Sequence, residues 1–285
     1  MESLPLVASF LVACAVVPAA VAGLAHEGLV RQNYRGERVA FPTGTALVAA
    51  ALLALIPVSL VQELGDADVF ATGAGAAITY VLGVALLGLL DDLLGSDREA
   101  GAPRGWRGHA RATASGRLST GALKAAGSLG LALYVLAGAG LDSLDYLLGV
   151  GVLVLSTNFF NLLDLRPGRS AKALLLLGAG LVAGAREVEP LWALGLFLGP
   201  ILVLLPQDLR ERGMLGDTGS NAIGAVAGLW LVFTLSTVGL AIALALLAAA
   251  TAYGEFRSIS TLIDRTPGLR QLDAVGRVRG RRTAS

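Results

Sequence analysis

The chain has 285 residues, of which 55% are hydrophobic and only 15% are charged, and it contains 37 glycines. This composition excludes an ordinary soluble domain and indicates an all-α polytopic membrane protein. The formal net charge is +1, and we expect no nucleic-acid partner. The single cysteine, Cys14, excludes an intramolecular disulfide bond.

The apolar residues are grouped in stretches long enough to cross a bilayer. A spanning helix requires about 20 mostly apolar residues, and we count nine candidates on this criterion. They are residues 4–25, 43–62, 69–90, 120–140, 145–163, 171–185, 190–206, 219–235 and 237–253. The sixth is short and the last two are closely spaced, so ten helices is the alternative count. We predict a transmembrane helical bundle over residues 1–256, followed by a basic cytoplasmic tail over residues 257–285.

The positions of the basic residues predict the orientation of this bundle. If the N-terminus lies outside the cell, every Lys and Arg except Arg186 falls on the inner side. Because Lys and Arg concentrate in cytoplasmic loops, we predict a multi-pass plasma-membrane protein whose C-terminus is cytoplasmic. A basic inner face favours an anionic cytoplasmic substrate.

Two adjacent carboxylates, Asp91 and Asp92, follow the third apolar stretch in the sequence LLDDLLG. They repel each other at the membrane boundary unless a cation compensates them. Mg²⁺ suits such a position because it prefers carboxylate oxygens, water and substrate phosphates. The alternative is a solvated acidic helix end. Lys124 falls a few residues inside the fourth stretch, so it must reach back to the interface or pair with an acid.

A second polar motif ends the fifth stretch, where the sequence NFFNLLD places Asn158, Asn161 and Asp164 three residues apart. If residues 147–163 form a helix, this spacing keeps successive polar side chains on adjoining positions of one face. One buried Asn could be explained by an interhelical hydrogen bond. Two Asn and an Asp beside arginines are more typical of a binding site.

A third motif, MLGDTGSNAIG, opens the eighth stretch and contains Asp217, Thr218, Gly219 and Ser220. Unpaired N–H groups and the helix dipole attract anions to helix N-termini. An ordinary helix cap is the alternative, because Asp, Thr and Ser all cap helices. In the predicted topology the three motifs share the cytoplasmic face. A metal-dependent reaction on a phosphate-bearing substrate accounts for them together.

With these three motifs in this order, the chain resembles the polyprenyl-phosphate N-acetylhexosamine-1-phosphate transferases, which include the phospho-N-acetylmuramoyl-pentapeptide transferase of cell-wall biogenesis. The resemblance implies transfer of a phospho-sugar from a UDP-sugar to polyprenyl phosphate, with UMP leaving and Mg²⁺ required. It also implies that the bilayer is the working environment, and it leaves a homodimer open.

The resemblance also implies roles for individual residues. Asp217 would be the main metal ligand, with Asp92 and Asp164 as further ligands. Asp91, Asp92, Asp217 and Lys124 would form the catalytic set, in which the aspartate pair positions or deprotonates the lipid phosphate. The expected substrate-binding residues are Asn158, Asn161, Asp164, Thr218, Gly219 and Ser220.

The chain departs from the family pattern in several places. The Lys or Asp expected after the aspartate pair is replaced by Leu93, and the chain is one helix short of the usual architecture. The Asp-Gly repeat after the second motif is replaced by LRPGR, and the C-terminal histidine motif is missing because the only histidines are His26 and His109. The donor sugar is therefore not specified. Three alternatives remain: an intramembrane prenyltransferase, which gives GDTGS no role; a transporter, which would need polar groups at both membrane faces; and a non-catalytic relative of the family.

Overall fold

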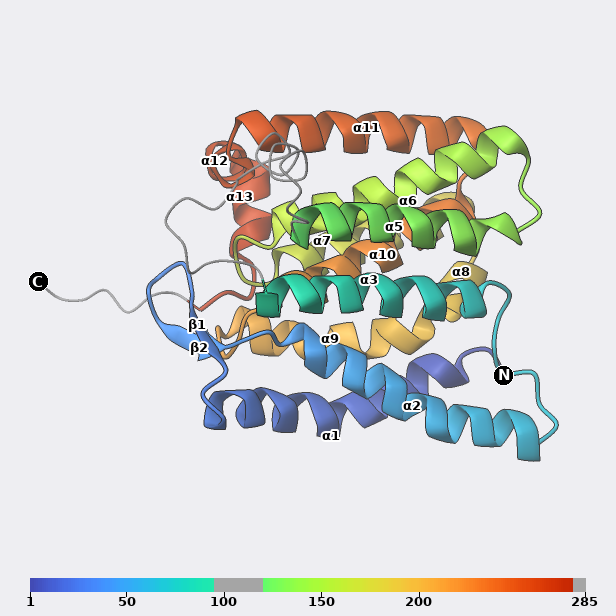
Figure 1. Ribbon diagram of the computed structural model, residues 1–285, viewed down its shortest axis with the longest axis horizontal. Coiled ribbons are helices and arrows are strands. Elements are labelled where there is room, and N and C mark those ends of the chain that lie inside the picture. The colour runs from blue at the N-terminus through green and yellow to red at the C-terminus, as the bar shows by residue number, and fades with distance from the viewer. Residues whose placement is uncertain (95–119, 279–285) are drawn as a thin grey trace, which may run out of the picture.

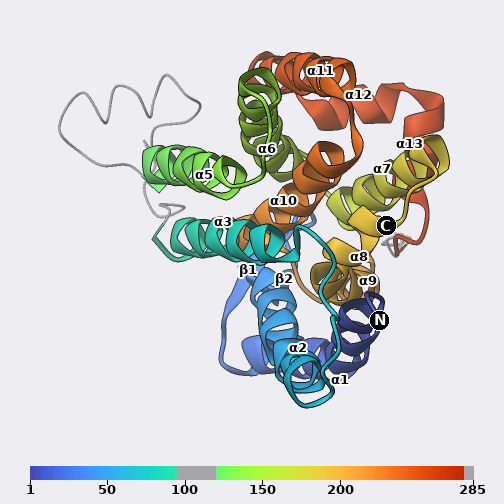
Figure 2. The same ribbon diagram turned by 90° about the vertical axis from the view of Figure 1, so that its right-hand side faces the viewer.

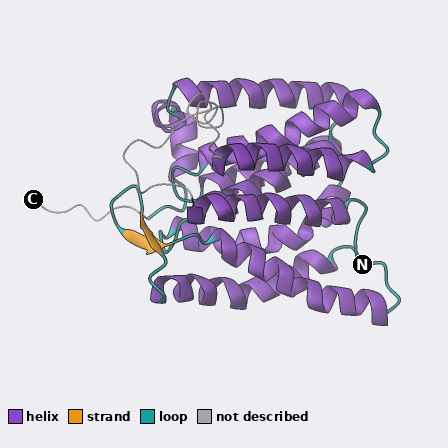
Figure 3. Ribbon diagram, in the orientation of Figure 1, coloured by secondary structure: helices purple, strands orange, loops and turns teal. Residues whose placement is uncertain are grey.

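The chain folds into a mostly helical bundle, which confirms the expected all-α membrane architecture (Figure 3). The computed structural model describes residues 1–94 and 120–278. Within these ranges, six helices are long and apolar enough to cross a membrane. They are α1 (Leu4–His26), α2 (Gly44–Leu64), α3 (Ala74–Leu94), α5 (Thr120–Ala137), α6 (Ser143–Leu163) and α11 (Thr237–Phe256).

The other predicted stretches are also helical, but they are shorter or more polar. They form α7 (Arg169–Ala185), α8 (Glu189–Ala193), α9 (Gly195–Leu209) and α10 (Gly216–Thr234). The predicted helix over residues 190–206 is divided at Leu194 into α8 and α9. Helix α10 begins with the polar GDTGSN sequence and continues with mainly small and apolar residues.

Helix α10 is the centre of the bundle, and Figure 2 shows it enclosed by α3, α6 and α7. Every residue from Thr218 to Leu231 is buried. The glycines and alanines in this range allow neighbouring backbones to approach closely, which is how helices associate where lipid replaces water. By contrast, α11 buries only Leu240 and packs on the outside of α6 (Figure 1). Because α10 is central, its polar first turn lies among the ends of the helices that enclose it.

A short β-hairpin, formed by β1 (Val30–Gln32) and β2 (Arg38–Ala40), joins α1 to α2. The Asn33 side-chain oxygen accepts hydrogen bonds from the backbone N–H groups of Arg35 and Glu37, which closes the turn. The hairpin also holds the segment before α10, because the Met214 N–H donates to the Ala40 carbonyl at 2.9 Å. The sequence pattern does not indicate this hairpin, because its three-residue strands are too short to show an alternation of apolar and polar residues.

The C-terminal residues fold back onto the same end of the bundle as two short helices, α12 (Ile259–Arg265) and α13 (Pro267–Ala274) (Figure 1). Ile259 and Ile263 of α12 are buried against Leu163, the last residue of α6. The N-terminus lies at the opposite end of the bundle (Figure 1). The hairpin, α12 and α13 therefore gather around the helix ends that carry the sequence motifs.

Candidate functional site

The three sequence motifs meet at the hairpin end of the bundle. Asp92 lies in the last turn of α3, Asn161 in the last turn of α6 and Asp217 in the first turn of α10. Lys124 comes from the first turns of α5. These four side chains are linked by direct contacts or by the backbone of α10, as the predicted convergence of the motifs requires.

Asp92 caps the N-terminus of α10. One carboxylate oxygen accepts a hydrogen bond from the Asp217 N–H at 2.9 Å. The other accepts from the Thr218 N–H at 2.9 Å and from the Thr218 hydroxyl at 2.6 Å. A carboxylate at this position satisfies unpaired amides and interacts favourably with the helix dipole. Asp92 is only 8% exposed, so its main structural effect is to join α3 to α10.

The glycines around this cap are required by space as well as by conformation. Gly216 has a positive φ of 71°, and a Cβ at this position would lie 2.7 Å from an Asp92 carboxylate oxygen. Gly88 lies where α3 crosses α10, and a Cβ there would lie 2.4 Å from the Asp217 carbonyl oxygen. The first glycine of GDTGS therefore allows the backbone to turn directly under the capping carboxylate.

Asp217 is the polar centre of the site. Its carboxylate forms an ion pair with Lys124 and accepts a hydrogen bond from the Asn161 amide at 3.2 Å. The Asn161 oxygen in turn accepts from the Ser220 hydroxyl at 3.2 Å. The Lys124 ammonium also lies 3.8 Å from an Asp91 carboxylate oxygen. Lys124 thus lies between two carboxylates that repel each other.

The side chains of this Lys124–Asp91–Asp217 cluster remain accessible. They are 17%, 25% and 26% exposed, respectively. Both carboxylates are therefore partly exposed at the surface formed by the described residues. Asp91 and Asp92 are adjacent in sequence, but Asp91 faces the open cluster and Asp92 faces the start of α10.

The remaining predicted residues have less direct positions. The side chain of Asn158, one turn before Asn161, forms no hydrogen bond within the described part of the chain. Thr218 donates its hydroxyl to Asp92, and Gly219 packs against the backbone of Gly44 in α2. Through these contacts, Thr218 and Gly219 fix the position of the start of α10.

Asp164 lines a separate small cavity beside the Asp217 cluster. The cavity has a volume of about 40 Å³, which is room for a few water molecules. Burial raises the pKa of the Asp164 carboxyl well above its usual range, and the nearby charges of Asp208, Asp217 and Asp92 raise it further. The cavity is lined by Asn33, Tyr34, Val39, Asp164, Leu165, Arg166, Pro167, Asp208, Glu211, Gly213 and Met214.

The oxygen ligands available at the cluster suit a hard cation. Among the described residues, no group of three His, Cys, Asp or Glu side chains is arranged to hold a metal ion by itself. The exposed carboxylates of Asp91 and Asp217 could serve as two ligands, with the remaining positions filled by substrate phosphate and water. That division is characteristic of Mg²⁺ sites that act on phosphates.

Several residues near the site were missed by the sequence analysis. The Arg31 guanidinium lies 3.8 Å from the centre of the Phe41 ring and donates to the Asp92 carbonyl at 3.4 Å. Asp208 at the end of α9 accepts from the Gly168 N–H at 2.7 Å. Asn221 is fully buried, and both its side-chain polar atoms lack a partner among the described residues. Only Asn221, which follows GDTGS directly, carried a signal in the sequence.

A comparison with known protein families finds no match for this chain, and a comparison with curated proteins finds none either.

Proposed function

We propose that the protein transfers a phospho-sugar, an N-acetylhexosamine-1-phosphate, from a UDP-sugar to polyprenyl phosphate with release of UMP. The observation that carries this proposal is the Lys124–Asp91–Asp217 cluster, in which one cation and two accessible carboxylates come from three different helices. Phosphoryl transfer depends on positioning and charge neutralisation more than on covalent help, and this cluster offers both.

The proposed reaction exchanges one phosphorus–oxygen bond for another. An oxygen of the polyprenyl phosphate bonds to the phosphorus that carries the sugar, and the bond from that phosphorus to the UMP oxygen breaks. Lys124 would neutralise charge on the phosphates, and Asp91 would hold the lipid phosphate or accept its proton. Asp217 and the Asn161 amide would face the diphosphate.

Mg²⁺ is the proposed cofactor, held by Asp217 and Asp91 together with phosphate and water. When bound, it would offset the negative charge of the diphosphate and of the incoming phosphate. Asp92 already receives three hydrogen bonds from the start of α10, so we assign it to holding Asp217 in place rather than to the metal. Asp164 is assigned to the substrate, from the wall of the neighbouring cavity.

We further propose the membrane arrangement in which this reaction would take place. The bundle would cross the plasma membrane with its N-terminus outside and with the hairpin, α12 and α13 in the cytoplasm. In addition to the six long apolar helices, α7, α9 and α10 would cross the membrane inside the bundle. The Lys124–Asp91–Asp217 cluster would then open at the cytoplasmic leaflet, where UDP-sugars and the phosphate of a membrane lipid can meet.

The test is a direct assay of the purified protein with Mg²⁺, polyprenyl phosphate and a panel of UDP-sugars. We expect UMP release and a lipid-linked sugar phosphate with at least one donor. Asp217→Asn should lower the rate at least about a hundredfold, as expected for loss of a preorganised charge. Asp68→Asn is the matched control, because Asp68 is an exposed aspartate on the α2–α3 connection at the opposite end of the bundle.

Two results would contradict the proposal. Equal rates for the wild type and Asp217→Asn would show that the cluster is not the reaction centre. UDP-sugar binding without any turnover would instead identify a non-catalytic relative of the transferases.

A further inference from the structure

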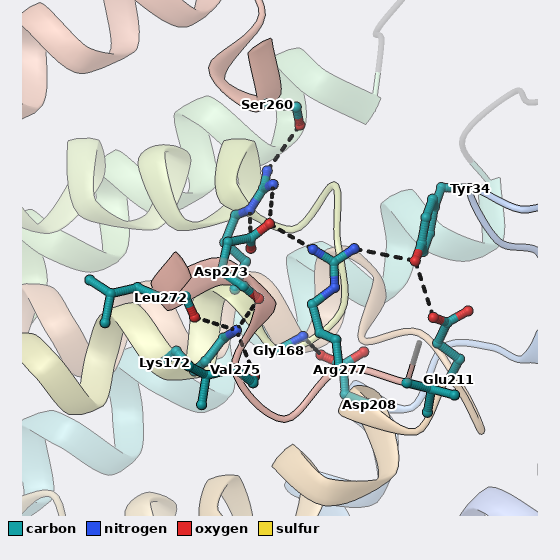
Figure 4. Close-up of polar contacts among 12 residues, drawn as sticks. Tyr34, Gly168, Lys172, Asp208, Glu211, Ser260, Leu272, Asp273, Val275 and Arg277 are labelled. Atoms are coloured by element: carbon teal, nitrogen blue, oxygen red, sulfur yellow. Dashed lines mark hydrogen bonds and ion pairs between the residues drawn. The ribbon is translucent and has the colours of Figure 1, made fainter. Parts of the chain in front are cut away.

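The C-terminal segment, residues 258–278, is bound to the bundle by a buried ion pair. The Asp273 carboxylate receives two parallel hydrogen bonds from the Arg169 guanidinium, at 2.9 and 3.0 Å. Both side chains are only 6% exposed. The third nitrogen of the Arg169 guanidinium donates to the Ser260 hydroxyl at 2.9 Å, so one arginine holds both α12 and α13 (Figure 4). Paired, charge-assisted geometry of this kind is both strong and specific.

A second cation holds the end of α13. The Lys172 ammonium donates to the backbone carbonyls of Leu272, Asp273 and Val275, at 3.1, 2.6 and 3.2 Å. These carbonyls belong to the last turn of α13 and the residue after it, where a helix lacks internal partners and favours a positive charge. Arg169 and Lys172 therefore do more than follow the charge distribution of cytoplasmic loops; they form the docking site for the C-terminal segment.

The segment also reaches the hairpin beside the Asp164 cavity. Arg277 forms an ion pair with Asp273 at 2.6 Å and donates to the Tyr34 hydroxyl at 3.2 Å (Figure 4). Arg35 of the hairpin turn donates to the Val278 carbonyl at 2.9 Å. The Arg166 guanidinium also lies over the Tyr34 ring, 4.3 Å from the ring centre.

These contacts hold the chain on both sides of the short turn that joins α6 to α7. Leu163, immediately before Asp164, packs against Ile259 and Ile263 of the C-terminal segment. Arg169, at the other side of the turn, pairs with Asp273. The five residues between them, numbers 164–168, include the Asp164 and Arg166 side chains that line the cavity.

We propose that the C-terminal segment positions the α6–α7 turn, so that Asp273 acts as a positioning residue for Asp164 and Arg166. The inference rests on the proposed function only in assigning the UDP-sugar as the ligand of that turn. Release of the segment would leave the Lys124–Asp91–Asp217 cluster intact, because none of the contacts described for that cluster involves residues 258–278. The effect should therefore fall on donor binding rather than on the chemical step.

The first measurement is hydrogen–deuterium exchange of the full-length protein, which does not depend on any activity. In Asp273→Asn, we expect the amides of residues 164–170 to exchange about tenfold faster or more, while α3 and α10 keep their protection, because local opening is independent of global unfolding. Asp264→Asn is the control, because Asp264 is an exposed aspartate of the same segment. Unchanged exchange at 164–170, or equally faster exchange in every helix, would overturn the proposal.

The second measurement separates positioning from a general loss of folded protein. Asp273→Asn should raise KM for the UDP-sugar about tenfold with a smaller change in kcat, the pattern of lost binding. A merely structural role would leave fewer active molecules and would lower the maximal rate at unchanged KM, which would count against the proposal. If the wild type turns over no UDP-sugar, the proposed function fails, and the exchange experiment still decides whether the segment holds the turn.

Discussion

Asp91 and Asp92 are neighbours in sequence with different environments in the structure. Asp92 is buried and receives three hydrogen bonds from the start of α10. Asp91 is a quarter exposed and faces Lys124. A helix places consecutive residues about 100° apart, so one aspartate can face the neighbouring helix while the next faces the open cluster.

We therefore predict that the same substitution affects stability at Asp92 and the reaction rate at Asp91. Asp92→Asn should lower the free energy of unfolding by about 1–3 kcal/mol, because the Asn NH₂ group would face N–H donors that need an acceptor. Asp91→Asn should leave the melting temperature nearly unchanged but lower UMP release about a hundredfold, since it removes charge from the reaction site. Thermal unfolding and rate measurements on both variants decide this, and equal destabilisation by both would contradict the division of roles.

At the scale of single residues, the sequence predicted the members of the site better than their contacts. The motifs NFFNLLD and GDTGS showed that Asn161 and Asp217 would be polar groups at helix ends, and the structure brings them together. The position of Lys124 in its helix indicated that this side chain had either to reach back to the interface or to pair with an acid, and in the structure it pairs with Asp217. The bidentate pairing of Arg169 with Asp273 could not be predicted, because the two residues are 104 positions apart and only the fold brings them together.

The crossing of α3 and α10 sets the geometry of the site at the scale of elements. At Gly88 the two backbones are too close for a side chain, since a Cβ would lie 2.4 Å from the Asp217 carbonyl oxygen. Separating the helices would move Asp92, the cap on α3, away from the α10 amides that it satisfies. The packing of this crossing and the position of Asp217 are therefore coupled.

Gly88→Ala should destabilise the protein by about 1–3 kcal/mol, as overpacking of a close contact does, and should also reduce UMP release. Gly75→Ala, at the other end of the same helix, is the matched control because a Cβ there meets nothing within 4 Å. We expect that change to be neutral or stabilising by at most about 1 kcal/mol. Calorimetry and the transferase assay measure both effects. A Gly88→Ala protein with normal stability and a normal rate would show that α3 and α10 can move apart without loss of stability or activity.

The hydrophobic pattern predicted the helices well, because a long apolar stretch in a membrane has no water to bond its backbone N–H and C=O groups and satisfies them by forming a helix. It predicted one helix where α8 and α9 are separated at Leu194, because the apolar pattern runs through the break. The β1–β2 hairpin shows no comparable apolar pattern in its sequence. Its turn depends on the Asn33 side chain and on Gly36 at a φ of 80°, and its position depends on backbone pairing with the segment before α10.

At the scale of the whole molecule, the distribution of basic residues predicts which end of the bundle faces the cytoplasm. Single cysteines can test this, since Cys14 is the only native cysteine and can be replaced by Ser. In intact cells, an impermeant maleimide should label Glu63→Cys, an exposed position in the last turn of α2, and should not label Arg270→Cys, on α13, until the cells are opened. The reverse pattern would place the candidate site outside the cell and would exclude cytoplasmic UDP-sugars as donors.

The docking of the C-terminal segment should also depend on pH. Burial alone would raise the pKa of the Asp273 carboxyl, but its hydrogen bonds with Arg169 and the charges of Arg169, Arg277 and Lys172 bring the pKa below its ordinary value of 3.8. A carboxyl whose pKa is lower in the folded state stabilises that state at pH values above its unfolded pKa, and the contribution is lost as pH falls through the folded pKa. The segment should therefore stay docked from about pH 8 to pH 5, and acid should release it only below about pH 4.

A spin label at Leu269→Cys in the Cys14→Ser protein can report this release, because Leu269 is an exposed residue of α13. We expect restricted label motion in the wild-type segment at neutral pH and a change to rapid motion only in acid. Adding Asp273→Asn should make the label mobile at neutral pH and remove this acid transition, since the titrating group is gone. Release between about pH 5 and 7 in the wild type would show that a group with a higher pKa, rather than Asp273, controls the docking.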